Sequence, residues 1–238
     1  MLEAVLFDWG DTLVHGEWDL ELLEAGHTAG LRAIGHEPLP ELTVRFRDAY
    51  LPLLGAPGTL EEVDYADLVA RLLADSGVAA GEADVERFLE AEHAFWEPAH
   101  QLASTTHALL EALRERGLKV GLVSNAVDPP ALLHRDLDRL GVAERLDFAV
   151  FSSEAGVRKP HPAIFERALD ALGVAADRTL FVGDSLAADI AGARALGMHT
   201  CQAVWFRADD DPSAAEADFQ AFTQMDVLTV VRRLAERS

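Results

Sequence analysis

The stretch LEAVLFDWGDTL (residues 2–13) begins with a short, mostly apolar run, 2–8, whose last residue is Asp8. The length of this run and its apolar residues predict a buried strand that ends at Asp8. Three later stretches also carry polar groups at, or just after, the end of an apolar run: GLVSNA (121–126), RKPHP (158–162) and FVGDSLAAD (181–189). The repeated arrangement predicts a sheet whose strand ends carry the functional side chains.

The four stretches supply complementary functional groups. Asp8 and Asp184 are carboxylates, Ser124 carries a hydroxyl and Lys159 carries an ammonium. Carboxylates, together with water and phosphate oxygens, are the usual ligands of Mg²⁺ in proteins. The set can therefore hold a divalent cation, grip a phosphoryl group and attack it.

Two patterns divide the chain. Between about residues 17 and 98, apolar residues recur every three or four positions, which predicts four helices in succession. After about residue 103, predicted helices alternate with short apolar strands, as in sheets built from right-handed crossovers. We therefore predict an α/β fold in which 1–14 and 103–238 form a doubly wound, mostly parallel sheet and 15–102 form an inserted all-helical domain. Ligands bind beyond the carboxyl ends of such strands, so the four stretches are expected to converge.

Composition limits the function. The chain has 238 residues, 50% of them hydrophobic, and a formal net charge of −21, which disfavours nucleic-acid partners. We expect no signal peptide and no membrane span, because the first residues lack a basic region and no apolar run approaches the ~20 residues that cross a bilayer. Cys201 is the single cysteine, which excludes an internal disulfide and suits a reducing compartment. A cytoplasmic protein is expected.

Four motifs carry a family resemblance: DxxxTL from Asp8, SN at 124–125, KP at 159–160 and GDSxxxD at 183–189. In combination they resemble the haloacid dehalogenase (HAD) superfamily, in the subfamily whose helical cap follows the first strand. The resemblance covers essentially the whole chain. It implies a Rossmann-like core with a cap, and a Mg²⁺-dependent phosphatase that hydrolyses a small-molecule phosphomonoester through an aspartyl-phosphate.

The resemblance also implies residue roles. Asp8 would be the nucleophile and would hold Mg²⁺ together with Asp184 and the backbone carbonyl of Gly10. Asp189 would support this site from behind; its alternative role is an acid that complements the dipole of the helix that begins there.

Four further contacts would hold the phosphoryl group. Ser124 would donate its hydroxyl, helped by the amide of Asn125, and Lys159 would neutralise charge in the transition state. Thr12 would contribute hydrogen bonds in the loop after Asp8, or serve only as a turn residue.

One position departs from the family pattern. Phosphatases of the family usually carry an aspartate two residues after the nucleophile as general acid and base, whereas this chain has Gly10 there. Asp11 follows, and it is the candidate to move protons in its place. General acid–base catalysis contributes ~10²–10⁴-fold, so its loss would favour substrates with good leaving groups.

Gly10 keeps two alternatives open. A 2-haloacid dehalogenase-type hydrolase needs no metal and no protonated leaving group, but the resemblance implies an aromatic residue at position 10 and no metal-binding aspartate like Asp184. A non-catalytic binding or regulatory protein of the same fold would have no physical need for Lys159 and Asp184.

The expected partner is a small phosphorylated metabolite, with no nucleic acid and no membrane, bound by a monomer or homodimer. The substrate would be selected by side chains between the two domains. Six candidates are expected to face that gap, or else to lie in the cap core or on the surface: Trp9, His15, Trp18, His93, Trp96 and His100.

Overall fold

The computed structural model describes residues 1–16, 19–54, 60–206 and 216–236. Its main sheet has six strands in the order β5-β4-β1-β6-β7-β8. All pairings in this sheet are parallel, which confirms the predicted fold class. The strands are β1 (Ala4–Phe7), β4 (Lys119–Ser124), β5 (Phe148–Phe151), β6 (Thr179–Gly183), β7 (His199–Ala203) and β8 (Phe219–Ala221).

Helices cover both faces of this sheet. One face packs against α5 (Thr106–Glu115), α6 (Pro130–Arg139) and α10 (Asp226–Glu236), and the other against α8 (Pro162–Leu172) and α9 (Ala191–Ala195). Side chains of β1 alternate between the two: Val5 and Phe7 join the first apolar cluster, and Leu6 joins the second. Burial on both faces explains why β1 reads as an unbroken apolar run.

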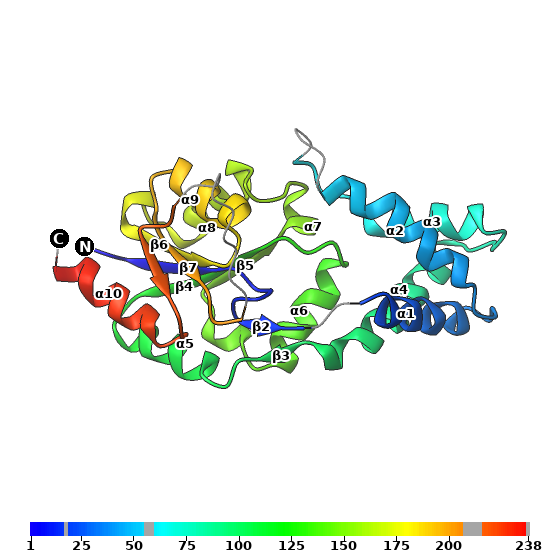
Figure 1. Ribbon diagram of the computed structural model, residues 1–238, viewed down its shortest axis with the longest axis horizontal. Helices are drawn as coiled ribbons and strands as arrows, with labels where there is room; N and C mark the ends of the chain where they lie inside the picture. Colours follow the sequence, from blue (N-terminus) through cyan, green and yellow to red (C-terminus); the bar gives the residue numbers. More distant parts are fainter. Residues whose placement is uncertain (17–18, 55–59, 207–215, 237–238) are drawn as a thin grey trace.

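The four predicted helices of the inserted region form at one end of the molecule, away from the sheet (Figure 1). They are α1 (Leu20–Ala33), α2 (Pro40–Leu54), α3 (Tyr65–Asp75) and α4 (Glu82–Trp96). Their apolar faces pack on one another in a cluster of their own, which includes Leu31, Leu73 and Phe88, all fully buried. None of the described helices is both long and apolar enough to cross a membrane.

A short ribbon lies where the chain passes between the sheet and the helices. β2 (Val14–His15) pairs antiparallel with β3 (Gln101–Leu102), and η1 (Glu97–Ala99) joins α4 to it. The sequence did not predict this ribbon, because a strand of two residues shows no periodicity. It joins the segment that leaves the sheet domain before α1 to the segment that returns to it after α4.

A second contact ties the loop before α3 to the loop that precedes Lys159. The backbone N–H of Glu62 donates to the carbonyl of Gly156 (3.0 Å), and that of Arg158 donates to Leu60 (2.7 Å). The side chains of Arg158 and Glu62 form an ion pair of 3.0 Å in which Glu62 is almost fully buried. The inserted helices are thus attached to the sheet domain on two sides.

The remaining short elements lie in the connections of the sheet domain. They are α7 (Ser152–Ala155), η2 (Ala143–Arg145), η3 (Ala176–Arg178) and a π-helical turn, η4 (Leu186–Ile190). The helical pattern LAADIAGARALG (186–197) predicts one continuous helix. In the structure, η4 occupies its first turn and α9 continues it from Ala191 to Ala195. This turn carries Asp189 into the site described next.

Candidate active site

The carboxyl ends of β1 and β6 bring two acidic loops together at the centre of the sheet. Asp8 follows β1, and its backbone N–H donates to the carbonyl of Val182 in β6 (2.9 Å). Asp184 follows β6 directly. Carboxylate oxygens of Asp8, Asp184 and Asp189 all lie within 4.8 Å of one another, and all three residues are buried.

Lys159 reaches into this acidic cluster from the loop after α7. Its Nζ lies 2.6 Å from Asp8 Oδ1 and 2.6 Å from Asp189 Oδ1. Asn125 fixes the backbone of Lys159, because its Oδ1 accepts from the Lys159 N–H (2.7 Å) and its Nδ2 donates to the Lys159 carbonyl (3.1 Å). The side chain of Asn125 is therefore a tie that positions the ammonium.

Burial and charge act against each other in this cluster. Burial lowers the pKa of Lys159, but Asp189 and Asp8 outweigh it, so that the pKa is raised and the ammonium stays charged. Burial raises the pKa of Asp189 to about 7, against the opposing effect of Lys159. Lys159 and Asp189 therefore stabilise each other in a buried cluster that water does not solvate.

The donor chemistry of the cluster fits a hard divalent cation. It offers three carboxylates against one ammonium and so carries an excess of negative charge. Buried carboxylates of this kind are stable when a cation coordinates them, and Mg²⁺ prefers such oxygen ligands. The backbone of Gly10 lies two residues from Asp8, in the same loop.

Asp189 lies deeper than a helix-start acid on a protein surface. It is fully buried in η4, where its Oδ2 accepts from the backbone N–H of Ser185 (3.0 Å). Gly183 makes room for it, because a Cβ at that position would overlap the Asp189 carboxylate. The glycine of the GDS motif thus serves the approach of Asp189, a reason that the sequence alone did not show.

The two hydroxyl candidates differ in their surroundings. Ser124 ends β4 and lines the cavity described below. Thr12 is fully buried and is not among the residues that line it; within the described part of the chain, its Oγ1 has no hydrogen-bond partner. The Thr12 carbonyl accepts from Trp205 Nε1 (2.9 Å) and from Gln224 Nε2 (3.1 Å), which holds the loop after Asp8 in place.

Gly10 and Asp11 both line the cavity. A Cβ on Gly10 would meet no other atom within 4 Å. Asp11 has a φ of 51°, a left-handed conformation that aspartate and asparagine tolerate better than most residues. Its Oδ1 lies 2.8 Å from His15 Nδ1, and the His15 ring stacks on Phe206 with centroids 4.8 Å apart.

A cavity of about 400 Å³ opens between the sheet domain and the inserted helices, next to these loops. Of the six side chains expected to face the gap, Trp9, Trp96 and His100 line it. His15 lines a neighbouring hollow instead. His93 is buried and is not among the residues that line the cavity, and Trp18 falls outside the described residues.

Three aromatic residues of the cavity wall were not predicted from the sequence: Phe46 and Tyr50 of α2 and Tyr65 of α3. The only signal for them was the spacing of Phe46 and Tyr50, four residues apart on one helix face. That spacing shows a shared face but not what the face covers, which depends on how the inserted helices dock.

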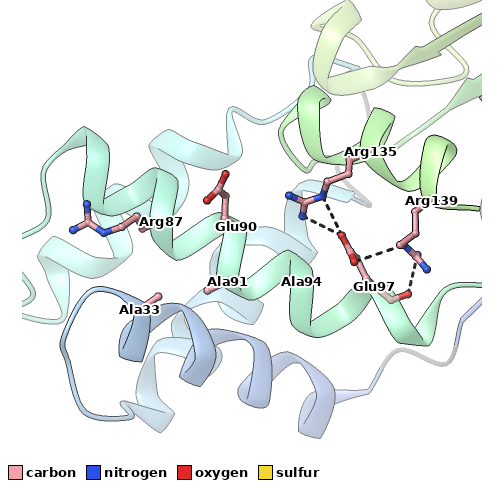
Figure 2. Close-up of a pocket in the computed structure, with 8 residues that line it drawn as sticks. All are labelled: Ala33, Arg87, Glu90, Ala91, Ala94, Glu97, Arg135 and Arg139. Carbon is pink, nitrogen blue, oxygen red and sulfur yellow. Dashed lines mark hydrogen bonds and ion pairs between the residues drawn. The ribbon is translucent and has the colours of Figure 1, made fainter.

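A second group of possible metal ligands, His93, Glu97 and Asp136, lies between α4 and α6. Figure 2 shows that Arg135 and Arg139 both reach Glu97 there, in a larger hollow of about 690 Å³. Arg139 also pairs with Asp136 (3.2 Å). The carboxylates of Glu97 and Asp136 are thus already paired with arginine side chains of the protein. We interpret the group as a contact that joins α4 to α6 and not as a catalytic site.

Known proteins give the geometry a context. The family model described as haloacid dehalogenase-like hydrolase matches residues 2–197. A glyceraldehyde 3-phosphate phosphatase of Methanopyrus kandleri is 31% identical over 99% of this chain and 100% of its own length. A phosphoserine phosphatase of Thermus thermophilus is 34% identical over 78% of this chain and 70% of its own length.

Solved structures show the same fold. A HAD phosphatase from Thermococcus onnurineus is similar with a TM-score of 0.68 and 24% identity, over 97% of this chain and 98% of the other. A 2-haloacid dehalogenase from Pseudomonas syringae is similar with a TM-score of 0.67 and 26% identity, over 98% and 100%. The fold alone therefore does not separate the two chemistries; the side chains must.

Proposed function

The chain belongs to the haloacid dehalogenase-like hydrolase family and is a hydrolase of the phosphatase type, and we propose that it is a Mg²⁺-dependent phosphomonoesterase with Asp8 as its nucleophile. The observation that carries this is the convergence of the buried carboxylates of Asp8, Asp184 and Asp189 with the ammonium of Lys159. A dehalogenase that uses no metal would need the nucleophile but not a metal-binding carboxylate such as Asp184.

Asp8, Asp184 and the carbonyl of Gly10 would hold the cation, with Asp189 behind them. Bound there, Mg²⁺ would reduce the repulsion between a phosphate and the acidic cluster. Lys159 adds a fixed positive charge beside Asp8. Ser124 and the backbone N–H of Asn125 would donate to phosphoryl oxygens, since the Asn125 side chain is occupied by Lys159.

The proposed reaction has two displacements at phosphorus. An Asp8 oxygen forms a bond to phosphorus while the bond from phosphorus to the alcohol oxygen breaks, and the alcohol leaves with a proton. Water then attacks the phosphorus of the aspartyl-phosphate, which releases inorganic phosphate and regenerates Asp8. We assign the proton transfers to Asp11, which lines the cavity and is held by His15.

The inserted helices 15–102 act as the cap over this site in our proposal, and 1–14 with 103–238 as the catalytic core. The substrate is a small phosphorylated metabolite. A reducing, cytoplasmic setting suits Cys201, a free and buried thiol.

The test is hydrolysis of p-nitrophenyl phosphate as Mg²⁺ is titrated, with Asp8→Asn, Asp184→Asn and the exposed control Asp177→Asn. We expect metal-dependent turnover that both site variants abolish and the control retains. Mg²⁺ should also raise the melting temperature of the wild type, because a ligand that binds only the folded state stabilises it. Turnover that persists in EDTA, or in Asp8→Asn, would refute the proposal.

A further inference from the structure

The cavity wall is unusually rich in rings. Trp9 contributes from the sheet domain, and four rings come from the inserted helices: Phe46, Tyr50, Tyr65 and Trp96. Phe46 stacks on Tyr50 with centroids 5.2 Å apart, and meets Tyr65 edge-on at 5.7 Å. These contacts fix the rings before any ligand arrives, and fixed aromatic rings bind flat apolar groups well.

The polar tips of Tyr65 and Trp96 are already engaged by the protein. The Tyr65 hydroxyl donates to Glu92 Oε2 (2.9 Å), and Trp96 Nε1 donates to the carbonyl of Leu22 (3.1 Å). The amide of Asn125 is taken by Lys159. Ser124, Asp11, Asp128 and His100 also line the cavity, so the cost falls on those hydroxyl groups of a polyol or sugar that lie over the rings and find no partner there.

The charged residues of the cavity wall also disfavour one class of substrate, namely phosphates that carry a carboxylate. Among the described residues that line the cavity there is no lysine and no arginine, whereas Asp11 and Asp128 are both present. Arg158 is the cation that reaches the wall, through Tyr50, and the buried Glu62 neutralises it at 3.0 Å. His100 also lines the cavity, but its Nδ1 lies 3.4 Å from Asp136 Oδ2 and so already faces a carboxylate. A substrate carboxylate near Asp11 or Asp128 would therefore be desolvated opposite another carboxylate.

We propose that this cavity selects phosphomonoesters whose alcohol is flat, aromatic or apolar, and uncharged, and that it disfavours both carboxylate-bearing and polyol phosphates. The inference rests on the proposed function, because it concerns the leaving group of that reaction. It assigns the selection to the aromatic wall (Trp9, Phe46, Tyr50, Tyr65 and Trp96) and not to the acidic cluster.

The direct test compares kcat/KM for benzyl phosphate, phosphoglycolate and glycerol 3-phosphate with Mg²⁺ present. All three are phosphate esters of primary alcohols, so the comparison reports the fit of the alcohol more than its leaving ability. We expect benzyl phosphate to be preferred by at least ~10-fold over each of the others. Equal values, or a preference for phosphoglycolate or glycerol 3-phosphate, would overturn the inference while leaving the phosphatase intact.

Binding without turnover separates the two proposals. Trp9 and Trp96 line the cavity, so their fluorescence should report an aromatic ligand. We expect benzylphosphonate to quench it at concentrations at least ~10-fold lower than phosphonoacetate requires. That result in a protein that hydrolyses no phosphate ester would support the cavity inference and refute the phosphatase; indifference between the two phosphonates would refute the inference.

A charge placed in the wall should change the preference. Val127 lines the cavity and is half-buried, beside Asp128. Val127→Arg should raise kcat/KM for phosphoglycolate relative to benzyl phosphate by ~10-fold or more, because it supplies the missing cation. Val127→Gln is the control that is polar but uncharged, and an equal shift in both variants would contradict the electrostatic part of the inference.

Discussion

At the scale of single residues, the loop after Asp8 decides whether the site can move protons. Position 10 has no side chain, although the space there is open. Asp11 supplies a carboxylate one position later, in a left-handed conformation and in contact with His15. The loop thus contains a carboxylate, but at position 11 and not at position 10, where the family resemblance implies one.

Asp11→Asn tests this role without disturbing the loop, because asparagine also tolerates a φ of 51°. If Asp11 protonates the leaving alcohol, kcat for benzyl phosphate should fall by ~10²-fold or more, and kcat for p-nitrophenyl phosphate, whose leaving group needs no proton, should fall far less. Parallel measurements on the two substrates give the ratio.

The companion variant adds Gly10→Asp to Asp11→Asn. Because a side chain at position 10 meets no atom within 4 Å of its Cβ, the new carboxylate should restore much of the lost turnover on benzyl phosphate. Gly10→Asn in the same background should not. An Asp11→Asn protein with unchanged kcat on both substrates would remove Asp11 from the mechanism.

The sequence predicted which polar side chains of the site come together better than it predicted the contacts around them. Asp8, Asp184 and Lys159 come together because parallel strands end at one edge, which a topological argument can foresee. The tie between Asn125 and Lys159, and the room that Gly183 leaves for Asp189, depend on atomic contacts between distant segments. The aromatic wall depends on docking of the helical region, which no local pattern contains.

At the scale of elements, long periodic segments were predicted well and short ones were not. The four helices of the inserted region each span 11–15 residues, enough for the apolar period to show. The β2–β3 ribbon has two residues a strand and leaves no such signal. The π-helical turn η4 was predicted as ordinary helix, because its apolar pattern is that of an α-helix. The wider π-helical turn places Asp189 in the site, which the pattern does not reveal.

Gly183→Ala tests the link between η4 and the acidic cluster. The added methyl group would overlap the Asp189 carboxylate, so η4 must shift or Asp189 must leave Lys159. We expect a loss of about 1–3 kcal/mol in the free energy of unfolding and weaker stabilisation by Mg²⁺. Urea denaturation with and without Mg²⁺ measures both. Gly81→Ala is the control, because Gly81 precedes α4, outside the site, and a methyl group there would meet only Asp84 Oδ2, at 3.8 Å. Equal stability of Gly183→Ala and wild type would contradict the link.

At the scale of the whole molecule, a buried histidine joins the helical region to the sheet domain. His93 of α4 contacts Asp128 Oδ1 at 3.0 Å and Asp136 Oδ2 at 3.2 Å. Burial lowers the pKa of His93, but these two carboxylates raise it to about 9. Burial also raises the pKa of Asp136, yet His100 and His93 hold it well below its usual range.

The pH dependence follows from the sign of the His93 shift. A histidine with a pKa of about 9 when folded, and ~6.5 when unfolded, contributes stability that is complete below pH ~6.5 and is lost as the pH rises through about 9. We expect a loss of about 2–3 kcal/mol in the free energy of unfolding between these limits. Urea denaturation across this range should show it in wild type and much less in His93→Gln.

His36→Gln, at an exposed histidine, is the matched control and should keep the pH dependence of the wild type. A His93→Gln protein whose stability falls as steeply with pH as that of the wild type would show that other groups set the dependence, and that the ion pairs of His93 do not hold the two parts together.

In the proposed mechanism, Asp8 becomes phosphorylated in a site completed by Asp184 and Lys159. Quenching the enzyme in acid during turnover of benzyl phosphate, followed by mass spectrometry of its peptides, measures this directly. We expect one phosphoryl group on the peptide that contains Asp8, formed with Mg²⁺ and absent with EDTA or in Asp8→Asn. Phosphate release at the wild-type rate with no phosphorylated Asp8 peptide, or with the phosphoryl group on another residue, would contradict it.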